Sequence, residues 1–238
     1  MAGGAYSALS GMQARIAELD RIASDLANIS TAGYKSERTA TFAAERDFAA
    51  ALQSAVDVAG GGTRTDLSPG TITTTGRNLD VAIDGPGFFA VETAHGIRYT
   101  RSGNFGRRAD GTIVTVEDEP VLDTRNRRIK VGAGPLEIDP SGTVYAGGAS
   151  AGRIQLWEID EQNLVRETGS HFRTSPGVKP RPSTSPLVPG AIEQANVTVA
   201  DRMITLTEVM RNFEALQRGI SVLTNDVDSR AIAELGRR

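Results

Sequence analysis

The sequence predicts an α+β fold in which long N- and C-terminal helices form a coiled-coil-like inner domain and an antiparallel all-β domain lies between them. Three observations predict it. Apolar residues alternate at spacings of three and four near both ends of the chain, the pattern of a helix seam. Short alternating segments separated by turn residues fill the middle, as in antiparallel sheets. Five of the ten prolines fall within residues 176–190, which indicates a stiff linker.

The N-terminal helix is predicted within residues 1–35. Its seam consists of Leu9, Met12, Ile16, Leu19, Ala23 and Leu26, with charged residues around it. Gly33 is the predicted stop signal, because glycine tolerates the left-handed conformation that ends many helices. Residues 36–70 are predicted to be a connector. They could be helical or irregular, and they include the flexible break Gly60–Gly62.

The all-β domain is predicted over residues 71–175. Gly85–Gly87, Asp110–Gly111 and Ser141–Gly142 mark turns within it. The predicted strands are 71–75, 79–83, 88–92, 97–100, 112–116, 129–131, 136–138, 143–146 and 153–159. Many short strands without intervening helical patterns favour an antiparallel arrangement.

Residues 191–238 are predicted to hold the second terminal helix, after the proline-rich linker of residues 176–190. Thr198 and Asp201 form a capping-box pattern. The seam consists of Met203, Leu206, Met210, Phe213, Gln217, Ile220, Thr224 and Val227, and Val209, Leu216 and Leu223 widen it. The two helices could pair only with each other, but a stripe this wide can also contact further neighbours.

Composition excludes several classes of chemistry. The chain has 238 residues, a formal net charge of -3, no cysteine and two histidines. Disulfide scaffolds, thiolate zinc sites and cysteine nucleophiles are therefore excluded, and we expect no metal or other cofactor. Residues 1–9 lack the features of a secretory signal, and no apolar run approaches a membrane span. If the protein leaves the cytoplasm, we expect another route to carry it.

Two sequence patterns could mark a catalytic or a nucleic-acid-binding site, but the residues around them support neither well. Gly148–Gly152 matches the G-x-S-x-G nucleophile motif around Ser150, and Asp160 and His171 follow in hydrolase order. Because an alternating strand rather than a helix follows, we expect a hairpin turn there, although a serine hydrolase remains an alternative. The segment from Arg98 to Lys130 contains eight basic residues and five acidic residues. This excess is too small and too poor in aromatic residues to favour nucleic-acid binding.

Several segments resemble the sequence signatures of the bacterial flagellar rod and hook proteins. The first is Asp25–Lys35, in which Asp25 replaces the usual asparagine. The others are the central blocks Thr75–Phe89 and Tyr99–Phe105 and the C-terminal blocks Ala191–Asn196 and Arg211–Ala215. The chain departs from the family at Asp118–Pro120, where a Gly-Tyr/Phe-Pro turn is usual. Residues 77–80 and 213–217 are most similar to the proximal-rod branch.

The resemblance implies a non-enzymatic structural subunit of the flagellar basal-body rod. Such a subunit would polymerise through its terminal helices into a hollow shaft that transmits torque for motility. It would pass through the flagellar export apparatus without a cleaved signal peptide and work in the periplasm-spanning rod. Its partners would be copies of itself and other rod subunits, with no nucleic acid and no small-molecule substrate. A distal-rod or hook-type paralogue, and a coiled-coil adaptor with a β binding module, are the alternatives.

On this interpretation the subunit interface consists of the helix seams and the turn that follows the first helix. Gly33 and Tyr34 would set the angle at which the chain leaves that helix. The expected interface residues are Leu9, Met12, Ile16, Leu19, Leu26, Asn28, Gly33, Tyr34, Met203, Leu206, Val209, Met210, Phe213, Leu216, Ile220, Leu223 and Val227.

Overall fold

The computed structural model describes residues 2–39, 63–167 and 169–235. The chain divides into two compact units. The first, here called the helical unit, consists of Met1–Leu26, Thr39–Thr63 and Val199–Arg238. The second, here called the β unit, consists of Ala27–Arg38 and Arg64–Thr198. The predicted connector falls largely on residues 40–62, which lie outside the described residues.

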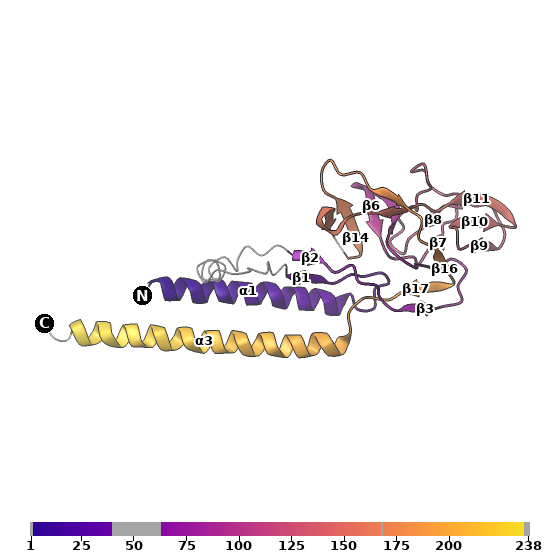
Figure 1. Cartoon of the computed structure of the whole chain (residues 1–238). Coiled ribbons are helices and arrows are strands. Elements are labelled where there is room, and N and C mark those ends of the chain that lie inside the picture. Colours follow the sequence, from indigo (N-terminus) through magenta and orange to yellow (C-terminus); the bar gives the residue numbers. More distant parts are fainter. Residues whose placement is uncertain (1, 40–62, 168, 236–238) are drawn as a thin grey trace. The chain divides into compact units, whose positions relative to one another are not determined.

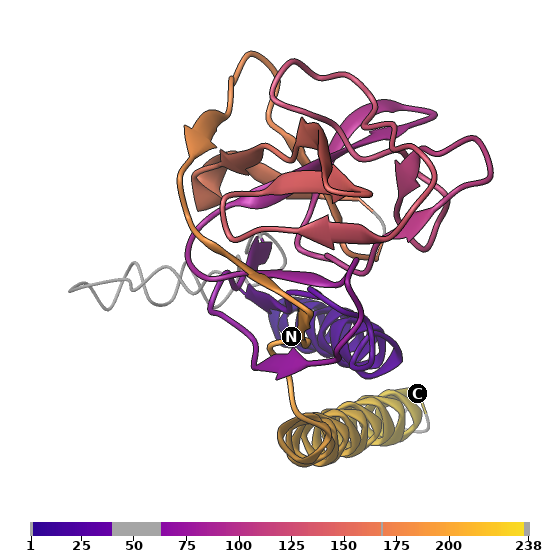
Figure 2. The same ribbon diagram turned by 90° about the vertical axis from the view of Figure 1, so that its right-hand side faces the viewer.

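Two α-helices belong to the described part of the helical unit, α1 (Ala2–Ala27) and α3 (Val199–Leu235). They run antiparallel, so that the first turns of α1 and the last turns of α3 lie at the same end (Figure 1). Figure 2 shows both helices nearly end-on. Near the other end of the pair, Arg202 Nε lies 3.1 Å from Asp25 Oδ2. Ile22 and Val209 are the buried apolar residues among the described side chains of these helices.

The predicted fold class is wrong, because no coiled-coil inner domain formed by long terminal helices is evident among the described residues. Beyond the two helices, the described chain is built largely of short strands. A coiled coil would bury its seam, yet Ile16 is 47% exposed, Met203 50% and Met210 49%. Among the described side chains of α1, the buried ones are instead Ile22 and Asp25, beside the predicted seam. Heptad spacing identifies an apolar stripe, but it does not specify what covers that stripe.

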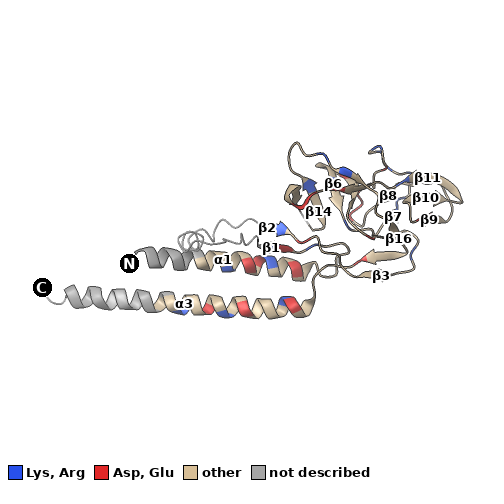
Figure 3. Ribbon diagram, viewed as in Figure 1, with Lys and Arg blue, Asp and Glu red and all other residues tan. Residues whose placement is uncertain are grey.

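Neither helix, within the residues that the structure describes, combines the length and apolar character that a membrane span requires. Charged residues recur on α1 from Arg15 onward and along the coloured part of α3 (Figure 3).

The β unit contains short strands and one 3₁₀ turn, η2 (Glu161–Asn163). The strands are β1 (Glu37–Thr39), β2 (Thr63–Thr65), β3 (Ile72–Thr74), β4 (Val81–Ile83), β5 (Phe88–Thr93), β6 (Gly96–Thr100), β7 (Gly106–Arg107), β8 (Ile113–Val114), β9 (Leu136–Ile138), β10 (Thr143–Ala146), β11 (Ala149–Arg153), β12 (Leu156–Glu158), β13 (Leu164–Arg166), β14 (His171–Thr174), β15 (Arg181–Ser183), β16 (Leu187–Pro189) and β17 (Ala191–Glu193). The outermost residues of β1 and β2 belong to the helical unit.

The largest sheet has the strand order β13-β14-β6-β5-β12-β15, and a second sheet has the order β11-β10-β9. The pairs β1-β2, β16-β4, β17-β3 and β7-β8 complete the strand pairing. All pairings from β3 onward are antiparallel. One apolar cluster is centred on Phe89, Phe105 and Ile113, and another on Phe88 and Phe172. These cores anchor the segments that form the candidate site.

The strand predictions were correct in places and incomplete elsewhere. Strands β5, β6, β9 and β10 fall where alternation predicted them. Within residues 129–131 no strand forms and Lys130 makes an isolated bridge to Thr112, while residues 153–159 divide between the end of β11 and β12. The proline-rich residues 176–190 contain β15 and β16, which pair with β12 and β4. Proline is compatible with such edge positions, where its missing N–H is not needed.

Candidate functional site

The segment Gly33–Arg38, which follows α1 along the chain, is held by residues from three distant parts of the β unit. We call it the exit segment. Its backbone bonds to the residues of β17 and just beyond, because Gly33 N donates to Glu193 O at 2.7 Å and Asn196 N donates to Tyr34 O at 3.2 Å. The first and last signature blocks, about 160 residues apart in the chain, are therefore adjacent.

A buried ion cluster lies beneath the exit segment. Lys35 Nζ is 2.5 Å from Glu193 Oε1, and the two side chains are 0% and 1% exposed. Arg101 Nε lies 3.4 Å from the other oxygen of Glu193. Burial lowers the pKa of Lys35 from its ordinary value, and the adjacent carboxylate of Glu193 offsets part of that effect. Burial likewise lowers the pKa of Arg101. Glu193 is thus the anion that makes two buried cations tolerable.

Further contacts fix the ends of this cluster. Lys35 Nζ also donates to Ser68 O at 2.8 Å, and Gly70 N donates to Glu193 Oε1 at 2.9 Å. Arg101 donates through Nη1 to Gly85 O at 2.9 Å. The cluster therefore joins the exit segment to β17, to the chain that enters β3 and to the loop after β4.

Arg166, at the end of β13, clamps the other side of the exit segment. Its Nε donates to Glu37 Oε1 at 3.0 Å, its Nη1 to Gly169 O at 2.8 Å, and its Nη2 to Lys35 O. The guanidinium also lies 4.8 Å from the ring centroid of Tyr34 and 5.0 Å from that of Phe172. Arginine suits this position because its planar fork can stack and form several directed hydrogen bonds at once.

Asn196 and Asp66 complete the grip on the exit segment. Asn196 Oδ1 accepts from Ser36 N at 2.8 Å, and its Nδ2 donates to Asp66 O at 2.8 Å. Asp66 N donates to Ser36 O at 2.8 Å, and Arg38 Nη2 lies 2.5 Å from Asp66 Oδ2. Each residue from Tyr34 to Arg38 thus has a specific partner, which defines the path of the chain through this site.

The backbone of Gly33 lies against that of Arg101, which belongs to the central signature block Tyr99–Phe105. The φ of Gly33 is 68°, in the left-handed region, and a Cβ there would lie 2.3 Å from the carbonyl carbon of Arg101. Only glycine fits both requirements. Gly33–Lys35, Arg101 and β17 belong to three different signature blocks, and the structure brings parts of these three blocks together. The arrangement can hold chain segments in register. Among the described residues no group of three His, Cys, Asp or Glu could hold a metal ion.

The predicted interface residues fall into different environments. Gly33 and Tyr34 are buried within the β unit, and Val209 is buried on α3. Asn28 and the seam residues Met12, Leu19, Leu26, Leu206, Phe213 and Leu216 are half-buried, whereas Ile16, Met203 and Met210 are exposed. The side chains of Leu9, Ile220, Leu223 and Val227 lie outside the described part of the structure.

Sequence reasoning singled out Gly33 and Tyr34 but not their partners. Lys35, Arg101, Glu193 and Asn196 all lie inside the signature blocks, so their shared block membership was an available signal. Arg166 lies outside those blocks and carried no comparable signal.

The hydrolase motif does not assemble into a catalytic site. Ser150 lies exposed on β11, next to a turn at Gly147–Gly148. His171 Nε2 lies 2.7 Å from Glu119 Oε2, and Asp160 pairs with Arg181 at 2.8 Å. Asp160 and His171 therefore have other partners, and Ser150 lies in a hairpin rather than in a nucleophile elbow.

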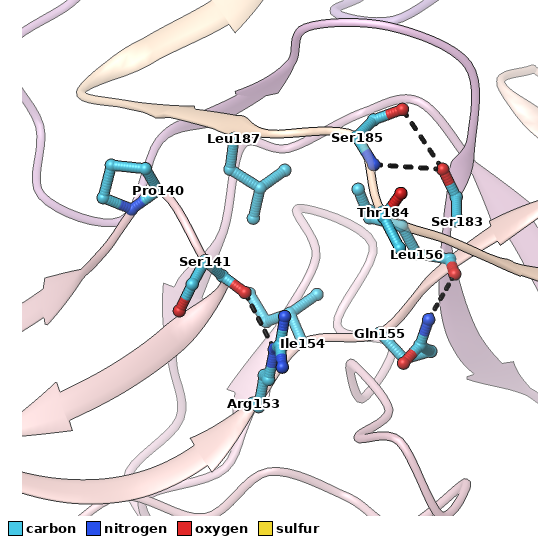
Figure 4. A pocket seen from close by; sticks show the side chains of 10 residues that line it. All are labelled: Pro140, Ser141, Arg153, Ile154, Gln155, Leu156, Ser183, Thr184, Ser185 and Leu187. Carbon is cyan, nitrogen blue, oxygen red and sulfur yellow. Dashed lines mark hydrogen bonds between the residues drawn. The ribbon is translucent and has the colours of Figure 1, made fainter.

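A small pocket of 80 Å³ lies elsewhere in the β unit (Figure 4). It is lined by Pro140, Ser141, Arg153, Ile154, Gln155, Leu156, Ser183, Thr184, Ser185 and Leu187. Its polar groups mainly support the backbone. Ser183 and Ser185 donate to Pro86 O at 2.8 and 2.6 Å, and Arg153 Nε donates to Ser141 O at 2.8 Å. The polar side chains around the pocket therefore hold neighbouring backbone segments in place.

The site fastens chain segments that are far apart in the sequence. Two known protein families match parts of the chain. The family described as flagella basal body rod protein matches residues 6–35, and the D1 domain of the flagellar hook protein FlgE/F/G matches residues 82–146.

The chain is 31% identical to the flagellar basal-body rod protein FlgF of Caulobacter vibrioides, over 98% of this chain and 97% of the relative. It is 32% identical to FlgG of Bacillus subtilis, over 88% and 90% of the two chains. It is also 32% identical to FlgF of Mesorhizobium japonicum, over 88% of each. The chain belongs to the flagellar basal-body rod protein family, and its role is that of a structural subunit of the rod, which assembles with other rod subunits.

Proposed function

We propose that the chain joins the rod through the apolar faces of its terminal helices. Five of the eight large apolar side chains that are exposed in the described residues lie on α1 and α3, and this observation carries the proposal. They are Ile16, Val199, Met203, Ile204 and Met210. Monomeric proteins rarely leave such side chains clustered in solvent, and clusters of this kind mark interaction sites.

Three of the four large apolar residues that are exposed in the described part of α3 form a stripe beside its buried face. Val199, Met203 and Met210 recur at helical spacing, so they lie on one side of the helix. Val209, which is buried, and the half-buried Leu206 and Phe213 occupy the adjacent side. The helix therefore has one apolar face that its own chain covers and a second apolar face that would contact a neighbouring subunit. The predicted interface residues on both helices would make the contacts between subunits.

Mixed charges favour contact between like subunits. Along α1 and α3, acidic and basic residues are interspersed (Figure 3), and Arg15 and Glu18 pair at 2.6 Å on α1. A helix with both signs of charge can pack against another copy without strong like-charge repulsion. On this proposal the subunits build the hollow, torque-transmitting shaft of the proximal rod, without enzymatic activity, nucleic acid or small-molecule substrate.

A single charge placed in the stripe tests the proposal. In a strain whose only copy carries Met210→Glu, we expect loss of rods and of swimming, because assembly would bury an unpaired carboxylate. The melting temperature of the purified chain should hardly change, since Met210 is exposed. Glu208→Gln, a one-charge change that faces away from the stripe, should swim normally. Normal rods in the Met210→Glu strain would refute the proposed interface.

We also propose that the flagellar export apparatus delivers the chain to the periplasm-spanning rod without cleaving a signal peptide. Membership in the rod family supports this route. The test is mass spectrometry of the protein in isolated basal bodies. We expect a peptide that begins at Met1 or Ala2. An N-terminus trimmed by a signal-peptide length would contradict the proposal.

A further inference from the structure

Among the described residues, strand β3 pairs with another strand along one edge only. It pairs with β17 in a two-stranded sheet, with Thr73 opposite Ile192. Gln194 N donates to Thr71 O at 2.9 Å, and Thr75 N donates to Gly190 O at 2.8 Å. In an antiparallel pair, alternate residues bond to the partner. Thr71, Thr73 and Thr75 therefore face β17, whereas the N–H and C=O groups of Ile72 and Thr74 point away from it.

The chemistry of this edge suits strand pairing. Every residue from Thr71 to Asn78 is exposed, and Ile72 is 38% exposed. Residues 71–75 are all β-branched, and no charged residue occurs before Arg77. Such residues favour extended structure. An uncharged, exposed edge of this composition is a template for another strand.

Other strand edges of the β unit carry features that discourage pairing. Strand β15, at one edge of the six-stranded sheet, contains Arg181 and Pro182. Strand β11, at the edge of the three-stranded sheet, ends in Gly152 and Arg153, and its register with β10 is interrupted by an irregularity. Charges, proline and bulges are the usual protection of edge strands. Strand β3 has none of them.

The exposed segment is also held in its extended shape. At one end Gly70 N donates to the buried carboxylate of Glu193 at 2.9 Å. At the other end Thr75 Oγ1 donates to Asp80 Oδ2 at 2.7 Å. A strand that is already ordered loses little conformational entropy when a partner binds. The ion cluster of the candidate site thus prepares this edge for pairing.

We propose that β3 accepts an extended strand from a neighbouring copy of this chain, which bonds to the backbone of Ile72 and Thr74. This mode is β-strand addition. It rests on the proposed rod function, because a rod places subunits side by side and the edge would otherwise be an aggregation hazard. The added strand is not the neighbour's own β3, since head-to-tail polymers join two different surfaces.

Proline substitutions distinguish the two sides of the strand. Thr74→Pro removes an outward N–H, and proline is tolerated where an edge N–H faces solvent. We expect its melting temperature to match that of the unchanged chain, while rod number falls about tenfold. Thr73→Pro removes an inward N–H and should lower the melting temperature. Normal rod assembly by Thr74→Pro would overturn the proposal.

Hydrogen exchange and cross-linking supply direct readouts. In the free chain we expect fast exchange at the amides of Ile72 and Thr74 and slow exchange at Thr73. In isolated rods all three should be slow, and a photoreactive residue at position 74 should attach to another copy of this chain. Unprotected amides in rods, or attachment to a different protein, would overturn the proposal. If Met210→Glu blocks rods while Thr74→Pro does not, strand addition fails and the helix interface stands.

Discussion

Glu193 shows how one buried residue can decide whether distant segments stay together. Its carboxylate contacts Lys35 and Arg101, which are themselves buried. Buried ion pairs often add little net stability, but removing one partner leaves an uncompensated charge. Because Glu193 serves two cations, its loss should cost more than the loss of either of them.

We therefore expect Glu193→Gln to lower the free energy of unfolding by about 3–5 kcal/mol. Urea-induced unfolding of the purified chain measures it. Glu137→Gln, an exposed position on β9, is the matched control and should change little. A double variant, Lys35→Met with Glu193→Leu, should regain part of the loss. A Glu193→Gln chain as stable as the original would contradict this account of the cluster.

Gly33 provides a second test at the residue scale. Gly33 and Gly76 both have positive φ values, 68° and 74°, but a Cβ at Gly76 would meet nothing within 4 Å. Gly76→Ala should therefore cost only the conformational penalty of about 1–2 kcal/mol. Gly33→Ala adds a clash with the backbone of Arg101 and should cost about 3 kcal/mol or more. Equal melting temperatures for the two variants would show that the close approach is unimportant.

The contacts of Asp123 predict that the free energy of unfolding depends on pH. Burial acts to raise the pKa of its carboxyl, but the N–H groups of Arg127 and Arg125 and the Arg127 guanidinium outweigh it and hold the pKa below its ordinary value. The ionised form therefore stabilises the fold above the unfolded pKa of 3.8. That stability is lost as pH falls through the lower, folded value.

Asp123→Asn should accordingly reduce the free energy of unfolding by about 1–2 kcal/mol at neutral pH. The deficit should shrink as the carboxyl of the unchanged protein becomes protonated at acid pH. Urea unfolding across the acid range measures both effects. Asp84→Asn, at an exposed position, is the control and should change the free energy of unfolding at neutral pH little. A deficit that stays constant into strong acid would contradict the assignment.

At the scale of elements, Arg166 joins the β13–β14 hairpin to the exit segment. Its guanidinium stacks on Tyr34 and Phe172 and donates to Glu37. Lysine would keep the charge but lose the fork and the stacking plane. We expect Arg166→Lys to lower stability by about 1–2 kcal/mol and to speed amide exchange in Tyr34–Arg38. The control is Arg173→Lys, at an ion-paired position on β14, and it should leave that exchange unchanged. Equal amide exchange in the two variants would argue that Arg166 does not hold the exit segment.

Sequence patterns anticipated some elements and missed others for physical reasons. Alternation located β10 because its side chains divide between a core and a half-buried environment. Strand β5 is instead buried on both faces, since Phe89 and Val91 join one apolar cluster and Phe88 and Ala90 join another. It missed β15 because Arg181–Ser183 is a polar edge strand whose pairing depends on β12. The glycine signal located Gly33, since the left-handed backbone restricts the residue locally. The contact between Lys35 and Glu193 spans 158 positions and left no local pattern.

The two helices illustrate the limit of periodicity. The heptads predicted a coiled-coil inner domain, and that prediction is wrong. Spacing reports which residues share a helix face, but the burial of Asp25 near Arg202 depends on tertiary pairing. The exposure of Met203 and Met210 is information that only the structure adds, and the proposed assembly interface depends on it.

At the scale of the whole molecule, folding and assembly depend on different residues. The described residues form three buried apolar clusters, the third made by Tyr34, Ala195 and Val197, and all three draw their members from residues 34–197, within the β unit. The candidate site lies in the same unit. The stripe proposed for assembly lies on α3, which belongs to the helical unit. A protein organised in this way should lose polymerisation without losing its main core.

A chain that ends at Thr198 tests this separation. Because the truncation removes no member of the three clusters, Trp157 fluorescence should still show one cooperative thermal transition. We expect its midpoint within about 4 °C of that of the full chain, the shift that about 1 kcal/mol produces in a domain of this size. The same truncation should abolish rods in a strain that has no other copy. A broad or strongly lowered transition would show instead that α3 is part of the folding unit, and the assembly defect would then follow from misfolding rather than from a missing interface.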